Sequence, residues 1–301
     1  MNIVMVSSVT MNPYVRLLGA ALEQADAGVT CAYETALTAD VAARWRGKAD
    51  VIHIHWPEIM IRGRSTLRTL RKLTRLARSL RTLKGAGSAV VYTAHNVRRS
   101  GDGVGLLGAL AEDIVYRSAD VVHVHDDGAR TELADRRPAR RCVVIAHGNY
   151  IGAYPDVIDG AQARQRLNID SDAFVYLALG QIRPYKGLAD LVSAFCSLPG
   201  EHLRLLIAGR PQHPRDGEHL QALAKDDRRV QVHARYVADD DVQVYVRAAD
   251  MCVFPYRSGT TSGAAILALS FGRPIIAPDV WPFRGLLRDG GAADAKVLGV
   301  R

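Results

Sequence analysis

The sequence lacks the features that mark several protein classes. Its four cysteines lie far apart and form no C-x-x-C pair, which argues against a disulfide framework or a zinc site and favours a reducing compartment. No run of about 18 apolar residues is present, so we expect no membrane-spanning segment. The first residues have neither the basic leader nor the unbroken apolar run of a signal peptide.

Two glycine-rich nucleotide motifs are also missing. No G-x-G-x-x-G follows the first expected strand, where the sequence reads VSSVTMNP, and this argues against a dinucleotide-dependent oxidoreductase. No G-x-x-x-x-G-K-[ST] loop occurs either, so the chain is not a P-loop protein. Aromatic residues make up 6% of the chain, which is few for the stacking platforms that bind nucleic acid, and no nucleic-acid partner is expected.

What is present is a repeated alternation of short apolar strands with helices. The 301 residues are 48% hydrophobic and 23% charged, and a chain of this length suits about two globular domains. Strands alternating with helices indicate parallel sheets. The alternation pauses in a polar stretch near residues 150–165. We therefore expect an α/β chain with two Rossmann-like domains, at residues 1–155 and 156–301.

Polar and aromatic side chains gather where the expected strands end. Ligands of open parallel sheets bind outside the carboxyl ends of the strands, so these residues are candidates for site edges, although such residues can also simply end a strand. An H-x-H pair places both rings on one strand face, as a metal site would, but no further ligand spacing supports a metal and none is expected. The candidates are His53, His55, Trp56, His95, Asn96, His123, His125, Tyr256 and Arg257.

The positive charge of the chain is concentrated in one segment. The formal net charge is +8, and residues 61–85 contain nine Lys or Arg and no Asp or Glu. Leucines recur there every three or four residues, which predicts an amphipathic helix with a cationic outer face. We interpret it as a contact for an anionic membrane surface. The alternative is a helix docked by its leucines with solvated arginines, and the two interpretations are compatible.

Two segments suit a phosphate-bearing ligand. Gly180 is followed by a basic loop with Arg183 and Lys186 and then by a helix, which offers fixed charge and free N–H groups to a diphosphate; the alternative is a lysine in a surface turn. The second segment, residues 254–278, has no carboxylate between Pro255 and Pro278. Its hydroxyls and helix-end amides can bind sugar hydroxyls or phosphate, and Ser262 is also a natural N-cap. These groups belong to Thr260, Thr261, Ser262 and Gly263.

With the TAHN turn, the segments LGQIRPYKGLADLVSAF, LRLLIAG and RAADMCVFPYRSGTTSGAAILALSFGRPIIAPDVW resemble GT-B glycosyltransferases of the retaining family 4 type. The resemblance implies an N-terminal acceptor domain and a C-terminal nucleotide-sugar domain. The glycine, arginine and lysine of the family's diphosphate loop fall on Gly180, Gln181 and Lys186, so Arg183 stands in for the missing arginine. The usual two glutamates are absent, with Gly259 and Leu267 at their positions.

The resemblance also implies roles for other residues. His95 would lie near the reacting sugar and orient it, and the nucleobase would lie near Tyr236. Tyr256 is a further donor-side candidate, beside the residues of the Gly180 loop and of the turn before residue 264. The acceptor side would include Asn12, Tyr14, His55, Trp56 and Asn96.

These observations predict a hexosyltransferase at the cytosolic face of the plasma membrane. It would move a sugar from a nucleoside diphosphate sugar, its co-substrate, to a lipid-linked saccharide or polysaccharide precursor, without a separate cofactor. The chain ends soon after FRGLLRDGG, where the family continues, so we expect a truncated second domain. The alternative is a non-catalytic remnant that binds only nucleotide or membrane.

Overall fold

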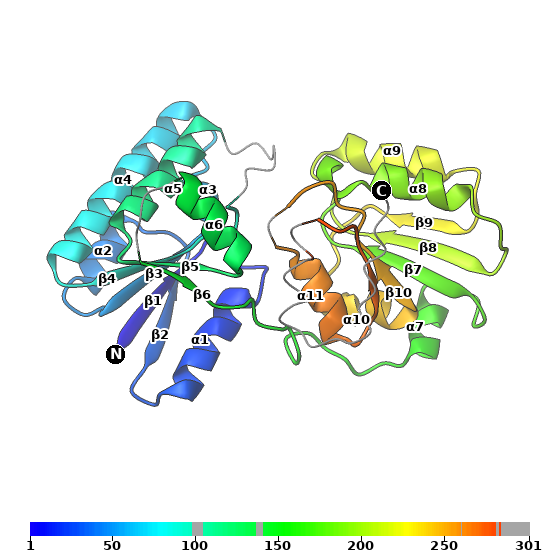
Figure 1. Ribbon diagram of the computed structural model, residues 1–301, viewed down its shortest axis with the longest axis horizontal. Coiled ribbons are helices and arrows are strands. Elements are labelled where there is room, and N and C mark those ends of the chain that lie inside the picture. Colours follow the sequence, from blue (N-terminus) through cyan, green and yellow to red (C-terminus); the bar gives the residue numbers. More distant parts are fainter. Residues whose placement is uncertain (98–104, 137–140, 260, 281–282, 284–301) are drawn as a thin grey trace. The chain divides into compact units, whose positions relative to one another are not determined.

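The computed structural model describes the chain except for residues 98–104, 137–140, 260, 281–282 and 284–301. It divides into two compact units, Met1–Gly148 and Asn149–Arg301. Each unit contains one parallel β-sheet covered by helices on both faces (Figure 1). The boundary lies a few residues before the one expected from the sequence, within the same polar stretch.

The N-terminal unit has a six-stranded parallel sheet with the strand order β2-β1-β3-β4-β5-β6. The central strands are apolar because both of their faces are buried, and Ile52, Ile54, Val90 and Val122 are fully buried. The strands are β1 (Asn2–Val6), β2 (Thr30–Glu34), β3 (Val51–His55), β4 (Ala89–Thr93), β5 (Val121–Val124) and β6 (Arg141–Val144).

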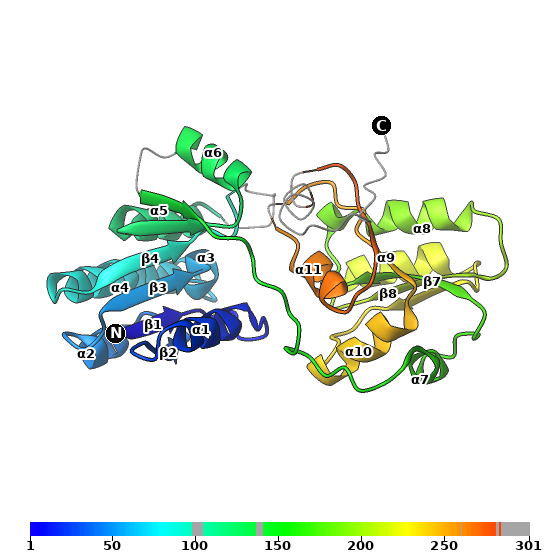
Figure 2. The same ribbon diagram turned by 60° about the horizontal axis from the view of Figure 1, so that its bottom comes forward.

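The helices of this unit are distributed unequally over the sheet. The chain runs from β1 to β2 in one direction and then returns across the sheet, so right-handed crossovers leave α1 alone on one face. Helices α2, α4 and α5 pack in a row on the opposite face (Figure 2). The helices are α1 (Tyr14–Ala25), α2 (Ala39–Trp45), α3 (Pro57–Met60), α4 (Thr66–Gly85), α5 (Leu106–Ser118) and α6 (Asp127–Arg136).

The C-terminal unit has a five-stranded parallel sheet with the order β11-β10-β7-β8-β9. The two sheets confirm the α/β fold class predicted from the alternating pattern. The strands are β7 (Phe174–Leu179), β8 (Leu203–Ala208), β9 (Val230–His233), β10 (Met251–Val253) and β11 (Ile275–Ile276).

In this second unit, α8 and α9 pack together on one face of the sheet, and α7, α10 and α11 lie on the other (Figures 1 and 2). The reversal after β9 explains this division, because the chain then crosses back to β10 over the opposite face. The helices are α7 (Gly160–Arg166), α8 (Leu188–Cys196), α9 (Pro214–Ala224), α10 (Asp239–Ala248) and α11 (Gly263–Ser270), with a short 3₁₀ turn, η1 (Pro184–Lys186).

An Ala-Asp pair precedes three of the strands and has the same structure each time. The backbone N–H of the aspartate donates to the carbonyl of a residue in the neighbouring strand, and its carboxylate accepts the N–H of that same residue. Asp50 binds Asn2 in this way, Asp120 binds Val90, and Asp250 binds Val175. The repeated dipeptide therefore anchors strand starts at the amino edges of both sheets.

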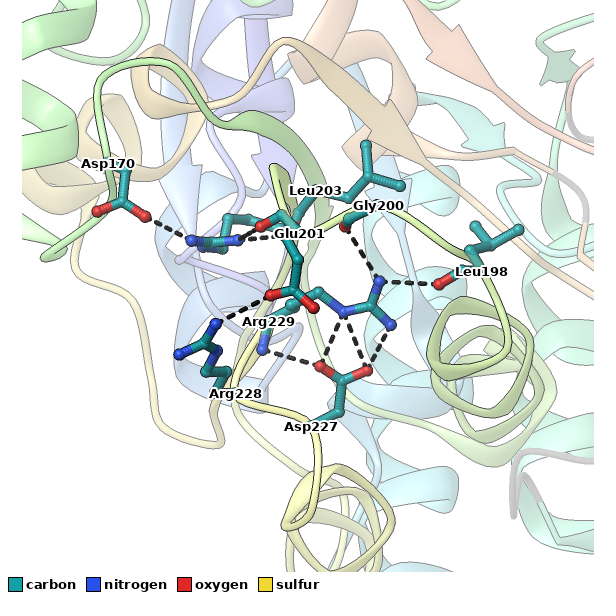
Figure 3. A network of polar contacts seen from close by, with 9 residues as sticks. Asp170, Leu198, Gly200, Glu201, Leu203, Asp227, Arg228 and Arg229 are labelled. Atoms are coloured by element: carbon teal, nitrogen blue, oxygen red, sulfur yellow. Dashed lines mark hydrogen bonds and ion pairs between the residues drawn. The ribbon is translucent and has the colours of Figure 1, made fainter.

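The amino edge of the second sheet is further fixed by ion pairs around β8 and β9 (Figure 3). The Arg229 guanidinium binds both carboxylate oxygens of Asp227 and donates to the carbonyls of Leu198 and Gly200 just after α8. These bonds hold the pKa of Asp227 low, at about 2. Arg229 thus satisfies carbonyls in the turn that follows α8, which is a structural role.

No helix in the described part of the chain is both long enough and apolar enough to cross a membrane.

Candidate functional site

Two glycines bring the ends of β7 and β8 close together in the C-terminal unit. Gly180 follows β7 with a φ of 121°, and Gly209 follows β8 with a φ of 154°. A Cβ atom at Gly209 would overlap the carbonyl of Gly180, and one at Gly180 would lie 3.1 Å from the Lys186 Nζ atom. Only glycine leaves room for this approach, so the backbone comes close to the Lys186 ammonium at the carboxyl edge of the two strands.

Lys186 lies at this edge with an unusual environment for a lysine. Its side chain is 8% exposed, and its Nζ atom lies 5.1 Å from the centre of the Tyr256 ring. Among the described residues, no carboxylate forms an ion pair with it. A largely buried ammonium group with no anionic partner is suited to a charged ligand, because burial makes an unpaired charge costly.

The first turn of α11 reaches the same place. The position of a Cβ at Gly180 would be 3.6 Å from Ala264 Cβ, so the turn lies beside the lysine. Ser262 caps the helix, since its buried Oγ atom accepts the N–H of Ala265 at 3.2 Å. The amides of Gly263 and Ala264 donate to no described residue. The capping role predicted for Ser262 is thus confirmed, and two helix-end amides remain for a ligand.

Arg183 has different surroundings from Lys186. Its Nε atom donates to Gln181 Oε1 at 2.9 Å. The residue lines a cavity of about 450 Å³ together with Arg215, His219 and Arg257, whereas Lys186 does not line it. Arg183 therefore contributes positive charge to this cavity and not to the surroundings of Gly180.

The remaining donor-side candidates are spread over the unit. Tyr256 is buried under Lys186 and packs against Tyr185 and Phe254. Tyr236 follows β9 and is 49% exposed. Thr261 is half-buried just before α11, and Thr260 lies outside the described residues.

In the N-terminal unit, polar side chains form a row on the α1 face of the sheet. The strand register places His55, Thr93 and His123 side by side. Because side chains alternate across a strand, His53, His95 and His125 point to the same face. The rings of His53 and His55 are 4.3 Å apart and those of His123 and His125 4.9 Å. We call these six residues, together with His147, the histidine row.

The histidine row is bonded mainly to itself. His55 Nδ1 lies 3.1 Å from His95 Nε2, and His95 Nδ1 lies 3.3 Å from His125 Nε2. His125 Nδ1 ends this chain 3.3 Å from the carbonyl oxygen of Ile145. A second chain runs from His53 through the Thr93 hydroxyl to His123, whose Nε2 lies 2.9 Å from the same carbonyl.

Burial keeps these rings neutral. Removal from water lowers the pKa of His53 and of His125 to about 3, and neighbouring histidines add to the effect. The same cause lowers the pKa values of His55, His95, His123 and His147 below their ordinary value. The row therefore offers hydrogen-bonding nitrogen atoms and not positive charge.

Aromatic residues cover the row at the carboxyl edge of the sheet. Trp56 stacks on His95 with 3.8 Å between ring centres, and it adopts a left-handed backbone conformation with a φ of 45°. Tyr14, the first residue of α1, packs edge-on against His55 and His95. The structure thus brings four of the predicted acceptor-side and catalytic residues together: Tyr14, His55, Trp56 and His95.

The other two acceptor-side candidates have local partners. Asn12 Oδ1 accepts the N–H of Tyr14 at 2.9 Å and so fixes the start of α1. Asn96 is exposed, and its side chain bonds to Glu58, a buried carboxyl whose pKa is raised by burial. Both residues support the walls of the row.

Sequence reasoning missed part of this cluster. Thr93 and His147 were not among the candidates, although the letters AHGN after β6 repeat the pattern of a histidine following a strand. The Ile145 carbonyl could not be found from side chains at all. Among the described residues, no group of three or more histidine, cysteine or acidic side chains is arranged to hold a metal ion.

Comparison with known proteins gives a family match in the second unit. The family model described as Glycosyl transferases group 1 matches residues 173–298, which is less than half of the chain. The matched residues include Gly180, Lys186 and α11, where part of the sequence resemblance lies.

The similarity to curated proteins extends into the first unit. A GDP-mannose:glycolipid 4-beta-D-mannosyltransferase of Xanthomonas campestris is 29% identical over 233 residues, which are 76% of this chain and 61% of the relative. A D-inositol 3-phosphate glycosyltransferase of Geodermatophilus obscurus is 27% identical over 278 residues, or 86% of this chain and 58% of the relative. The chain thus spans about three fifths of these relatives.

Solved structures establish the fold over nearly the whole chain. HepE of Anabaena, in complex with UDP-glucose, matches with a TM-score of 0.69 at 17% identity, covering 95% of this chain and 82% of that one. The sucrose-phosphate synthase of Thermosynechococcus elongatus matches with a TM-score of 0.69 at 19% identity, covering 94% and 82%. The predicted GT-B fold is confirmed.

Proposed function

We propose that the protein is a glycosyltransferase that moves a hexosyl group from a nucleoside diphosphate sugar to a lipid-linked saccharide or polysaccharide precursor. One observation carries this proposal. The buried ammonium of Lys186 meets the first turn of α11 beside Gly180, where no side chain intervenes. A cation, two helix-end amides and a glycine together suit a diphosphate.

The same groups account for the chemistry of the donor. When the bond between the sugar and the diphosphate breaks, negative charge grows on the leaving diphosphate. Lys186 and the positive end of the α11 dipole stabilise that charge, and Arg183 adds to the positive potential from the cavity that it lines. The hydroxyl of Thr261 and the amide of Gly263 would hold the donor in place of the glutamates that the family usually has. No separate cofactor takes part.

The acceptor would bind to the N-terminal unit along the aromatic cover of the histidine row. The name of the Xanthomonas relative, a glycolipid mannosyltransferase, supports a lipid-linked acceptor. His95 would help to position the reacting sugar at this edge; its own ring is stacked on Trp56 and hydrogen-bonded at both nitrogens to other histidines.

A transfer assay tests this function. The full chain is incubated with bacterial membrane lipid extract and radiolabelled GDP-mannose or UDP-glucose, and label in the lipid fraction is counted. We expect transfer by the wild-type chain, a loss in Lys186→Ala and none in Lys225→Ala, a lysine whose side chain is 70% exposed on the same unit. Nucleotide binding without transfer or donor hydrolysis would identify the non-catalytic alternative.

The basic helix supports a location at an anionic membrane surface, on the cytosolic side. On α4, Leu73, Leu76, Leu80 and Leu83 are buried against the unit, while Leu67 and Leu70 are 58% and 41% exposed. The docked interpretation therefore applies to the part of the helix with the four buried leucines. The membrane interpretation applies to its first turns, where two leucines are exposed. Exposed arginines lie among them at positions 68, 71, 75, 78 and 81.

These arginines have little to bind on the protein itself. Within the described chain, none of them forms an ion pair. Each basic residue close to an anionic bilayer contributes about 1 kcal/mol, and the two leucines add apolar insertion. The first turn of the neighbouring helix α5 adds Leu106, which is 79% exposed.

Vesicle sedimentation tests the membrane location. We expect the chain to sediment with phosphatidylglycerol-containing vesicles at low salt and not with purely zwitterionic ones. Replacing Arg68, Arg71, Arg75 and Arg78 by Gln should release it. A charge-matched control replaces four exposed arginines elsewhere, Arg46, Arg117, Arg166 and Arg228. Equal binding of the two variants would refute a role for α4.

A further inference from the structure

The two series of hydrogen bonds in the histidine row end at the same backbone carbonyl. This carbonyl determines which ring nitrogen carries the proton in each bonded histidine. The Ile145 oxygen can only accept, so His125 carries its proton on Nδ1 and His123 carries its proton on Nε2. A carbonyl oxygen has two lone pairs, and both are used. The tautomers of two rings are thus set by an atom that cannot change its role.

The tautomer of His125 in turn determines the tautomers of the other histidines in the first series of hydrogen bonds, from His125 through His95 to His55. A neutral His125 with its proton on Nδ1 has a bare Nε2, which must accept from His95 Nδ1. His95 then has a bare Nε2, which accepts from His55 Nδ1. Each neutral imidazole has one donor and one acceptor, so no other arrangement satisfies all three bonds. His55 is left with an unprotonated Nε2.

That last nitrogen has no partner. His55 Nε2 is buried and makes no hydrogen bond with any residue that the structure describes, and the His55 side chain as a whole is fully buried. A buried acceptor without a donor is rare in folded proteins and marks a place where a donor is missing. It also lies at the carboxyl end of β3, the edge where open parallel sheets bind ligands.

Two aromatic rings, those of Tyr14 and Trp56, each lie 5.9 Å from the His55 imidazole. Tyr14 is buried, whereas Trp56 directly follows His55 and its side chain is half-buried. Its backbone is in the left-handed region, which is unfavourable for a bulky side chain. Of the two rings near His55, that of Trp56 is therefore the one on a strained and partly exposed residue.

We propose that His55 Nε2 is a hydrogen-bond acceptor for a hydroxyl group of the glycan acceptor, reached when the Trp56 side chain moves aside. The site accepts a hydrogen bond and can donate none, so it selects a neutral hydroxyl over a carboxylate or phosphate. His95, His125 and the Ile145 carbonyl are positioning groups that hold His55 in the accepting tautomer. The inference rests on the proposed transferase function for the identity of its ligand.

The tautomers are tested without any substrate. The full chain is labelled with ¹⁵N-histidine and the ring nitrogens are assigned by NMR at neutral pH. We expect protons on Nδ1 of His55, His95 and His125 and on Nε2 of His53 and His123. A proton on His55 Nε2 would overturn the proposal.

Access to the nitrogen is tested with glycerol as a small hydroxyl donor. In Trp56→Gly, which removes the cover and suits the left-handed backbone, glycerol should shift the His55 Nε2 resonance. In Trp56→Phe, which keeps an aromatic cover, the shift should be absent. No shift in the glycine variant at any glycerol concentration would overturn the acceptor site.

The role in catalysis is tested by kinetics. His55→Asn keeps a donor to His95 and loses the distal acceptor, so it should raise KM for the lipid acceptor about tenfold and leave KM for the nucleotide sugar unchanged. His202→Gln, at an exposed histidine of the C-terminal unit, should not. An unchanged acceptor KM in His55→Asn refutes the role. A wild-type chain without transfer refutes the proposed function instead, and leaves the NMR results to decide the inference.

Discussion

At the scale of single residues, the proposed donor site depends on glycines whose missing side chains make room for other groups. Gly187 joins η1 to α8 with a φ of 66°, and a Cβ there would overlap the carbonyl oxygen of Pro255. The loop that carries Lys186 is thus pressed against the strand end that leads to Tyr256. The loop position and the lysine position are set together.

Gly187→Ala should therefore lower the free energy of unfolding more than a glycine-to-alanine change at a positive φ without such a contact. Gly272 has a φ of 69° and open space around it in the same unit, so Gly272→Ala isolates the backbone cost. We expect about 1 kcal/mol for Gly272→Ala and about 2 kcal/mol or more for Gly187→Ala in urea unfolding. If both changes lowered the free energy of unfolding equally, the contact between position 187 and the Pro255 carbonyl would have no effect on stability.

Some residue roles could be predicted from the sequence and others could not. Ser262 as a cap follows from a hydroxyl before an apolar helix, and the position of Lys186 follows from its loop. The tautomers of the histidine row depend on the Ile145 carbonyl, which any residue would provide. The left-handed conformation of Trp56 is likewise imposed by tertiary packing.

At the scale of elements, the Ala-Asp pairs show how strand starts are fixed. The Ala-Asp pattern can be read from the sequence, but the candidates for a site predicted from it all lie at the opposite ends of these strands. The structure shows instead that each aspartate joins two neighbouring strands. Asp250 binds Val175 of β7 and pairs with Arg164 of α7 at 2.8 Å, so it also fastens the first helix of the C-terminal unit.

Asp250→Ala should lower the free energy of unfolding of this unit. The change removes two hydrogen bonds to a charged group and leaves the half-buried Arg164 without its carboxylate, so we expect a loss of about 2–3 kcal/mol in urea unfolding. Asp226→Ala, at an aspartate whose side chain is 89% exposed, should change stability by less than about 0.5 kcal/mol. Similar effects of the two changes would contradict the anchoring role.

Whether a segment is a helix or a strand was easier to predict than which of its side chains are buried. Apolar strands alternating with helices indicated both parallel sheets, because burial on two faces leaves a plain signature. The leucines of α4 predicted a docked helix, but not that Leu67 and Leu70 would extend beyond the unit. That difference arises because the helix is longer than the surface that it covers.

At the scale of the whole molecule, the histidine row makes the stability of the N-terminal unit depend on pH. Unfolded histidines bind protons near pH 6.5, whereas His53 and His125 do so in the fold only near about 3. Between these values the unfolded chain binds more protons. Stability is therefore full above about pH 6.5 and falls as the pH is lowered toward 3.

We expect a loss on the order of 1 kcal/mol per pH unit for each histidine that stays neutral in the fold, between about pH 6.5 and about pH 5. Hydrogen exchange of β3 and β4 amides, with each rate divided by the intrinsic rate at the same pH, gives the opening free energy of the N-terminal unit alone. His53→Gln should reduce the pH dependence of this free energy, and His202→Gln, at an exposed site, should not. An opening free energy that is unaffected by this acidification would contradict the neutral row.

The central claim is that Lys186 and the first turn of α11 bind the diphosphate of a nucleotide sugar. Isothermal titration of the full chain with GDP and with UDP tests it most directly. We predict saturable binding of at least one of them, weakened about tenfold or more in Lys186→Ala and unchanged in Lys225→Ala. Binding that is equally strong in Lys186→Ala, or no binding of either nucleotide by the wild-type chain, would contradict it.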